Sequence, residues 1–132
     1  GKASKKFFST QSDMLFFTQS NLICEMATQE SCIFMGRCAD VVLTNNNIPH
    51  LSIFLSAPFK ERVKYEMGIA SCDYKTASVK TMDQERKNYY QYYTGRQWGY
   101  AGNYDLCVNT FFYGHDETIQ VLYDMAEMSC KK

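Results

Sequence analysis

The spacing of apolar side chains predicts an amphipathic helix near the start of the chain. Between Ser12 and Gln29, apolar residues recur at the three- and four-residue intervals of a helix, with polar residues around them. Ser12 or Asp13 can serve as the N-cap, because a short side-chain oxygen accepts a hydrogen bond from a free backbone N–H there. The residues expected on its buried face are Leu15, Leu22, Ile23 and Met26.

Three short runs have the apolar character or the alternation of β-strands. SCIFMG (31–36) predicts a buried strand that ends at Gly36, LSIFLS (51–56) predicts a second strand, and YDLCVNT (104–110) predicts a third.

Three further helices are predicted between and after these strands. PFKERVKYEM (58–67) has proline in its first turn, where its missing N–H does no harm, and stops near Gly68. A long polar and aromatic helix runs from about Cys72 to Thr94 and is closed by Gly95. The final helix is GHDETIQVLYDMAEMS (114–129), with Asp116 as its N-cap and a core face of Ile119, Leu122 and Met125 or Ala126.

The order of these elements predicts the fold class. Short strands separated by helices require crossover connections, which join parallel strands. At 132 residues and 45% hydrophobic, the chain can form one substantial core but not two. We therefore expect a single α/β domain over residues 1–132, in three layers, with helices on both faces of a parallel sheet.

Charge and cysteine content restrict the function. Fourteen basic residues balance fourteen acidic ones, so the chain lacks the basic field of a protein that binds nucleic acid through its phosphates, and any anion site must be local. There is no basic-then-apolar leader and no apolar run near about 18 residues, so we expect neither secretion nor a membrane span. The six cysteines form no C-x-x-C pair and fit buried free thiols, and His50 and His115 lack zinc-ligand spacing. We expect a reducing, cytoplasmic location, no metal site and no catalytic histidine.

Two segments could hold an anion. Gly36, Arg37 and Asp40 follow the first predicted strand, where glycine allows close approach of a ligand, arginine offers donors for phosphate and aspartate can accept from a sugar or base. An Arg37–Asp40 ion pair that fixes the loop is an equally good interpretation. In the second segment, Asp83 and Arg86 share a helix face, and Lys87 and Arg96 could reach the same side. An ordinary ion pair on a solvated helix is the commoner explanation for that spacing.

The same region is rich in rings: Tyr89, Tyr90, Tyr92, Tyr93 and Trp98. Such rings can stack on bases, but they are also ordinary packing residues, which is the default interpretation for most of them.

Three segments together resemble the cytidylate-kinase-like family of bacterial P-loop proteins, relatives of the nucleoside monophosphate kinases. They are SCIFMGRCADVVL, LSIFLSAPFKERVK and MDQERKNYYQYYTGRQWGYAGNYDLCVNT. The resemblance runs from roughly Phe16 to the final helix, and the run D-x-E-R-x-N-Y-Y-x-Y-Y-T-G-x-x-W-G is its most specific part.

The resemblance implies a P-loop kinase fold that transfers a phosphoryl group from ATP, with Mg2+, to a pyrimidine monophosphate such as CMP. It implies that Arg37 and Arg86 converge on the monophosphate and that Asp83 accepts from the ribose or the base. Arg86 and Arg96 would be catalytic, in a lid at about 70–103 that closes over the phosphates.

Several positions depart from that pattern. Cys38 stands where cytidylate kinases have an aspartate, and Val79 where they tend to have an arginine. From Gly1 to Asp13 there is no G-x-x-x-x-G-K-[ST] loop, so the expected fold lacks its N-terminal phosphate-loop strand and helix. The chain is either a fragment or a degenerate member, and we expect these residues alone to be inactive.

The alternative to a kinase is a non-catalytic module that binds a nucleotide or another phosphoanion. A single-stranded RNA platform is the weakest hypothesis, because the net charge is zero. The expected partners are a nucleoside monophosphate and ATP, without nucleic acid or membrane, and a homo-oligomer is left open.

Overall fold

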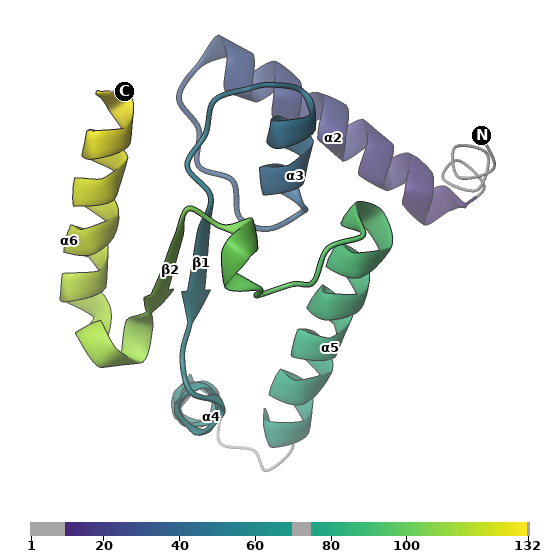
Figure 1. Cartoon of the computed structure of the whole chain (residues 1–132). Helices are drawn as coiled ribbons and strands as arrows, with labels where there is room; N and C mark the ends of the chain where they lie inside the picture. The colour runs from purple at the N-terminus through teal and green to yellow at the C-terminus, as the bar shows by residue number, and fades with distance from the viewer. Residues whose placement is uncertain (1–9, 70–74, 132) are drawn as a thin grey trace. The chain divides into compact units, whose positions relative to one another are not determined.

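The computed structural model describes residues 10–69 and 75–131. The chain forms two compact units, Gly1–His50 and Leu51–Lys132. Within the described parts, the first unit contains only helices and the second contains the sheet (Figure 1). None of the described helices combines the length and the apolar character needed to cross a lipid bilayer.

The long helix of the first unit is α2 (Gln11–Gln29). Its N-cap is Thr10, whose hydroxyl oxygen accepts a hydrogen bond from Asp13 N at 3.0 Å. The prediction of Ser12 or Asp13 as the cap was therefore wrong by two or three residues. Threonine, like serine and aspartate, can accept a hydrogen bond from an unpaired N–H of the first turn. The helix therefore begins directly after Thr10.

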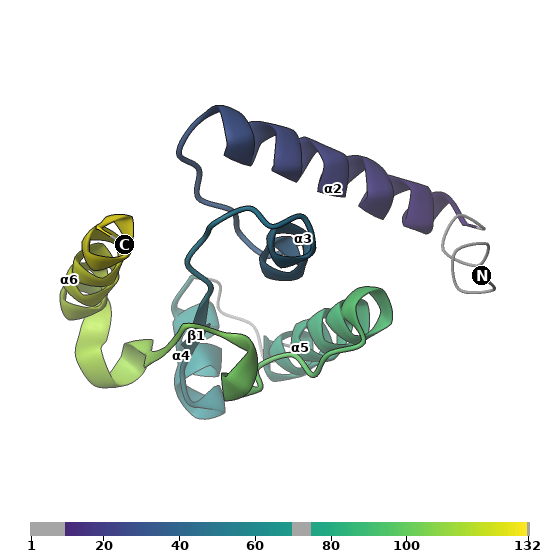
Figure 2. The ribbon, with the colours of Figure 1, turned by 45° about the horizontal axis from the view of Figure 1, so that its top comes forward.

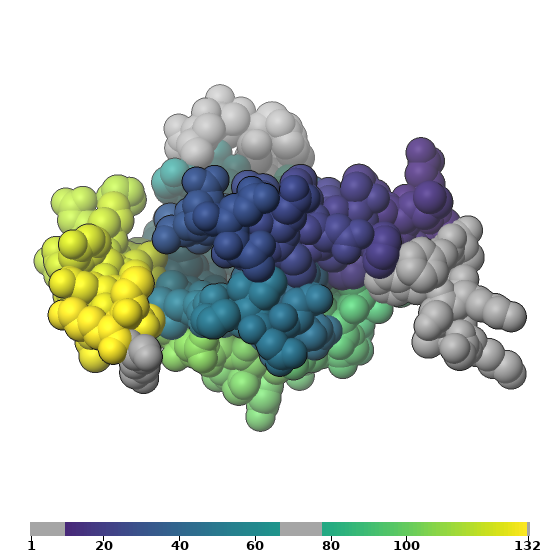
Figure 3. Space-filling view, turned by 90° about the horizontal axis from the view of Figure 1, so that it is seen from above, coloured from purple at the N-terminus to yellow at the C-terminus, as the bar shows by residue number. Residues whose placement is uncertain are grey.

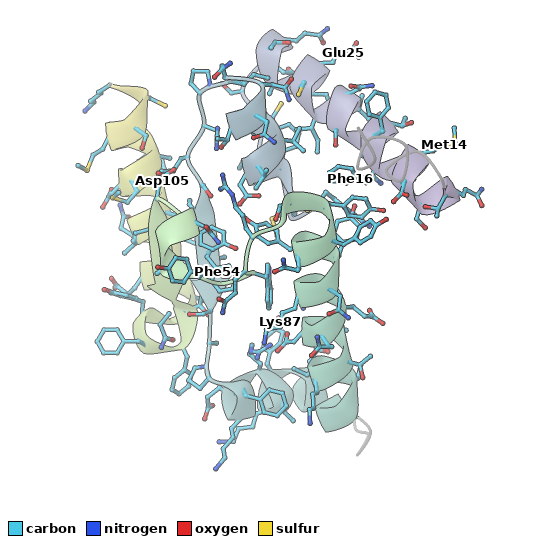
Figure 4. The ribbon with its side chains drawn as sticks, turned by 45° about the vertical axis from the view of Figure 1, so that its right-hand side comes forward. Met14, Phe16, Glu25, Phe54, Lys87 and Asp105 are labelled. Carbon is cyan, nitrogen blue, oxygen red and sulfur yellow. The ribbon has the colours of Figure 1, made fainter. Side chains whose placement is uncertain are left out.

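The buried face of α2 differs from the predicted one. Phe16 and Ile23, seven residues apart and thus two turns along the helix, are buried, whereas the other predicted core residues, Leu15, Leu22 and Met26, are exposed. Met14 also projects from the helix (Figure 4). The sequence offers apolar residues on two adjacent stripes, and periodicity alone does not say which of them is covered.

The predicted strand at 31–36 is absent: residues 31–35 are irregular, and Ile33 and Met35 are 92% and 85% exposed. A strand exists only where a neighbouring strand pairs its N–H and C=O groups, and no strand of the described residues pairs with this segment. Directly after it comes a helix that we had not predicted, α3 (Ala39–Asn45), which packs beside α2 (Figure 2).

The second unit is built on a parallel pair of strands, β1 (Ile53–Ser56) and β2 (Leu106–Asn109). Ile53 pairs with Leu106, and the register continues to the ends of both strands. The connection between them contains two helices, as parallel pairing requires. The α/β class and the parallel pairing are confirmed, while the three-layer arrangement stays a prediction.

The connecting helices are α4 (Phe59–Ile69) and α5 (Lys75–Thr94), which contact each other. The predicted start of the second helix at Cys72 lies outside the described residues. Its predicted end is confirmed, because Gly95 has a φ of +71° and donates from its N–H to Gln91 O at 2.9 Å. A short 3-10 helix, η1 (Ala101–Asn103), precedes β2.

The last helix, α6 (Thr110–Cys130), contacts both strands. Its N-cap is Asn109, whose Oδ1 accepts hydrogen bonds from Phe111 N and Phe112 N. Asp116, the predicted cap, lies inside the helix. The helix is kinked at Gly114. The C-terminal turns of α6 lie at the surface (Figure 3). Of the predicted core face, Leu122 and Met125 are half-buried, whereas Ile119 and Ala126 are exposed.

Candidate functional site

An arginine near the start of α4 is held in place by the turn that begins the helix. Pro58 O accepts from the N–H groups of Glu61 and Arg62, at 3.0 and 3.1 Å, so the first turn forms directly after the proline. Arg62 Nε donates back to Ala57 O at 3.1 Å, and its guanidinium carbon lies 5.6 Å from the centre of the Phe59 ring. These two contacts fix the orientation of the Arg62 guanidinium and leave its Nη1 and Nη2 atoms for a partner outside α4.

That fork meets a carboxylate on α5. Arg62 Nη1 and Nη2 donate to Asp83 Oδ1 and Oδ2 at 2.9 and 2.8 Å, a bidentate pair. The hydrogen bonds to Asp83 raise the pKa of Arg62, against a smaller opposing effect of burial. Both partners are half-buried, so this ion pair is less screened than one on an open surface. It ties α4 to α5.

Arg86 is the second cation beside the same carboxylate. Its Nη1 lies 3.7 Å from Asp83 Oδ1, too far for a good hydrogen bond, and its side chain is 51% exposed. The predicted shared face of Asp83 and Arg86 is thus present, as an i,i+3 pair. Taken together, the side chains of Arg62, Arg86 and Asp83 carry a net positive charge. Lys87, the next residue of α5, is exposed as well (Figure 4).

The turn after α5 places Arg96. Thr94 Oγ1 donates to Tyr90 O at 2.6 Å and accepts from Arg96 N at 3.0 Å. With Gly95 in the left-handed conformation, these bonds fix the direction in which the chain leaves the helix. The side chain of Arg96 is half-buried.

The segment that follows is anchored on β1 by rings. The Phe54 ring lies edge-on to Trp98 at 5.2 Å between centroids and against Tyr104 at 5.0 Å. Gly99 N donates to the Tyr104 hydroxyl oxygen at 3.1 Å. Phe54, labelled in Figure 4, thus connects the sheet to the loop beyond the arginine-bearing helix.

The tyrosines of α5 also contact one another. Tyr93 lies 4.8 Å from Tyr89 and 4.7 Å from Tyr92 between ring centroids, and Tyr90 is buried. Packing is thus observed for most of these rings, while Tyr92 remains 54% exposed.

In the first unit, the turn at Gly36 has an uncommon backbone. Gly36, Arg37 and Cys38 have φ values of +69°, +58° and +56°, which non-glycine residues rarely adopt. The turn leads into α3, whose first turn contains Asp40. Burial and the nearby Asp40 charge raise the pKa of the Cys38 thiol to about 12, against a lowering effect of Arg37. Arg37 and Arg86 belong to different units, and their convergence stays a prediction.

The histidines and the cysteines are the other candidate reactive groups of the described residues. His50 contacts Thr44 Oγ1 and Ile48 O, and His115 contacts Asp116 Oδ1; both rings are exposed. Among residues 10–69 and 75–131, no three His, Cys, Asp or Glu side chains are grouped so that they could hold a metal ion. The five cysteines of these segments are free thiols, and Cys72 lies outside them.

Arg62 is the residue of the candidate site that the sequence did not indicate. Its partner Asp83 is 21 residues away along the chain, on another helix, so no local spacing connects the two. The available signal was weak: a proline-initiated helix that carries an arginine in its first turn and lies after a strand, where parallel sheets collect their ligands.

Comparisons with known proteins show the family of the chain. The cytidylate kinase-like family matches residues 3–111, most of the chain. The chain belongs to the cytidylate kinase-like family. A crystal structure of an uncharacterized protein from Eubacterium ventriosum is 30% identical, with a TM-score of 0.68 over 79% of this chain. The chain spans 60% of the length of that relative. The search of curated proteins found no match for this chain.

Proposed function

We propose that the chain carries the acceptor side of a nucleoside monophosphate kinase. Together with a donor-binding segment, it would transfer a phosphoryl group from ATP to a pyrimidine monophosphate such as CMP. Membership in the cytidylate kinase-like family supports this reaction class. In the corresponding fold, β1 and β2 would belong to a larger parallel sheet of three-layer, P-loop kinase type.

The observation that carries the proposal is the surplus of positive charge at Asp83. Arg62 occupies both carboxylate oxygens, and Arg86 stands 3.7 Å away with half of its side chain exposed. Guanidinium groups suit phosphate because they remain charged and offer two parallel donors. Phosphoryl transfer needs little covalent help from a protein beyond positioning and charge neutralisation. Arg86 would bind the acceptor phosphate.

The other residues of the predicted site have proposed roles in the same function. Gly36, Arg37 and Asp40 would contribute a second group of ligands from the strained turn before α3, since unfavourable backbone conformations collect at functional sites. Arg96 would act from a lid at about 70–103, where the glycine turn after α5 permits a change of direction.

The donor nucleotide has no assigned residues in this chain. The 132 residues contain no G-x-x-x-x-G-K-[ST] loop, and no acidic cluster of the described residues suits Mg2+. The described residues therefore offer no group that suits ATP or Mg2+, and we assign no step of the transfer to this chain beyond binding of the acceptor.

Calorimetry of CMP binding tests the proposal. Arg86→Ala should weaken binding several-fold or more and leave the melting temperature nearly unchanged, because the side chain is half exposed. Lys80→Ala is the matched control, since it removes an exposed cation from the same helix. Equal affinity of Arg86→Ala and the parent would end the acceptor-site assignment.

A non-catalytic phosphoanion-binding module is the second candidate, since the half-exposed Arg86 guanidinium could bind a phosphate without transferring it. The two functions differ in one experiment. In the presence of a donor-binding segment, the protein should convert CMP, dCMP or UMP to the diphosphate with ATP and Mg2+. Binding without turnover of any monophosphate would establish the binding module.

A further inference from the structure

We infer that Arg62 is a positioning residue: by holding Asp83, it keeps Arg86 available for the acceptor phosphate. On this inference Asp83 acts through the arginines and is not the group that accepts from the ribose or the base. The inference rests on the proposed function, because it concerns the same anion site, and it adds a residue from a second helix to that site.

The distances show that Arg62 and Arg86 compete unequally for the Asp83 carboxylate. Each of the three nitrogens of Arg62 has an acceptor: Nη1 and Nη2 on Asp83 at 2.9 and 2.8 Å, and Nε on Ala57 O at 3.1 Å. Arg86 reaches Asp83 only at 3.7 Å. Asp83 therefore belongs to Arg62, and the charge of Arg86 is compensated only in part.

Removal of Arg62 would reverse this order. The Asp83 carboxylate would lose both short contacts, and Arg86 on the same face of α5 would be its remaining ion-pair partner among the described residues. A small rotamer change would turn the present 3.7 Å approach into a direct pair. Arg86 would then be neutralised by its own helix neighbour and would bind phosphate less well. This effect passes through Asp83, so it should vanish when the carboxylate is also removed.

A pair of variants tests this sequence of effects by calorimetry with CMP as the probe. Arg62→Ala should weaken binding about fivefold, the size expected for a half-exposed ion pair. The double variant Arg62→Ala with Asp83→Asn should bind within about twofold of the parent, since no carboxylate remains to capture Arg86. Both variants lose the tie between α4 and α5, so their melting temperatures should fall together. Recovery of affinity without recovery of the melting temperature is the expected signature.

The outcomes separate the inference from the proposed function. If Arg62 serves only the packing of α4, the single and double variants will bind equally weakly, which overturns the inference. Parent-like binding by Arg62→Ala overturns it too. If Asp83 itself contacts the ribose or the base, the double variant will bind more weakly than Arg62→Ala. Loss of affinity in Arg86→Ala without rescue in the double variant refutes the inference alone, whereas an unaffected Arg86→Ala refutes both.

Discussion

Ser52 and Asp105 exchange hydrogen bonds across the beginning of the sheet, although they are 53 residues apart in the chain. Ser52 N donates to Asp105 Oδ2 at 2.8 Å, and Asp105 N donates to Ser52 O at 2.8 Å. Each residue directly precedes a strand, and the first paired residues, Ile53 and Leu106, follow them. Asp105, labelled in Figure 4, therefore fixes the register of the parallel pair at its first step.

Replacement of Asp105 by alanine should destabilise the second unit. Ser52 is buried, so its N–H would lose a charged acceptor with little access to water, at a cost of about 1.5 kcal/mol in the free energy of unfolding. Urea denaturation measures this loss. Asp116→Ala removes an exposed carboxylate from α6 and should change stability by less than about 0.5 kcal/mol. Equal effects of the two substitutions would contradict the register role.

Gly99 should not tolerate a side chain. Its φ is +80°, and a Cβ atom built there would lie 3.2 Å from Phe54 Cζ. Gly99→Ala combines the cost of a left-handed alanine with displacement of the ring that anchors Trp98, together about 2 kcal/mol. Urea denaturation would measure the stability, and the fluorescence of Trp98 would report the disturbed ring contact.

Gly95 provides the matched control for that substitution. Its φ of +71° is similar, but apart from its chain neighbours no atom of the described residues lies within 4 Å of its Cβ position. Gly95→Ala should therefore cost only the backbone term, about 1 kcal/mol, and leave the Trp98 fluorescence unchanged. If both alanines destabilise the protein equally, the close approach of Gly99 to Phe54 does not affect stability.

The elements that could be predicted from the sequence are those whose signals are local. Gly95 ends α5 because a left-handed residue closes a helix, and the alternation of strands and helices predicts the parallel pairing of β1 with β2. The strand predicted at 31–36 is wrong for a non-local reason. Its apolar residues suit a strand, but pairing requires a neighbour, and the described strands do not provide one.

The candidate site divides in the same way. The pair of Asp83 and Arg86 follows from helical spacing within one turn, whereas Arg62 reaches Asp83 from another helix. The role of Asp83 as an acceptor toward the ribose or the base was implied by the family resemblance, and it stays a prediction. The contacts show its oxygens already engaged by an arginine that no sequence pattern connected to it.

Cys38 should be the least reactive of the described thiols. Its burial and its pKa of about 12, against a usual 9.0, leave roughly a thousandth of the ordinary thiolate fraction near pH 8. Iodoacetamide should therefore label Cys107 and Cys130, which are exposed, long before Cys38. Mass spectrometry of the digested protein after timed labelling measures the three rates. Similar rates at Cys38 and Cys107 would contradict the burial of this thiol.

The same thiol should make stability depend on pH. Because the pKa of Cys38 is raised on folding, the folded chain keeps a proton that the unfolded chain releases between pH 9.0 and about 12. The stabilising contribution is complete below pH 9.0 and is lost as the pH rises toward 12. Cys38→Ala lacks this group, while all other side chains are the same in both proteins. The stability advantage of the parent over Cys38→Ala should therefore shrink by about 1 kcal/mol per pH unit in that range, as measured by urea denaturation at a series of pH values. A constant difference would show that the Cys38 thiol ionises equally easily in the folded and unfolded chains.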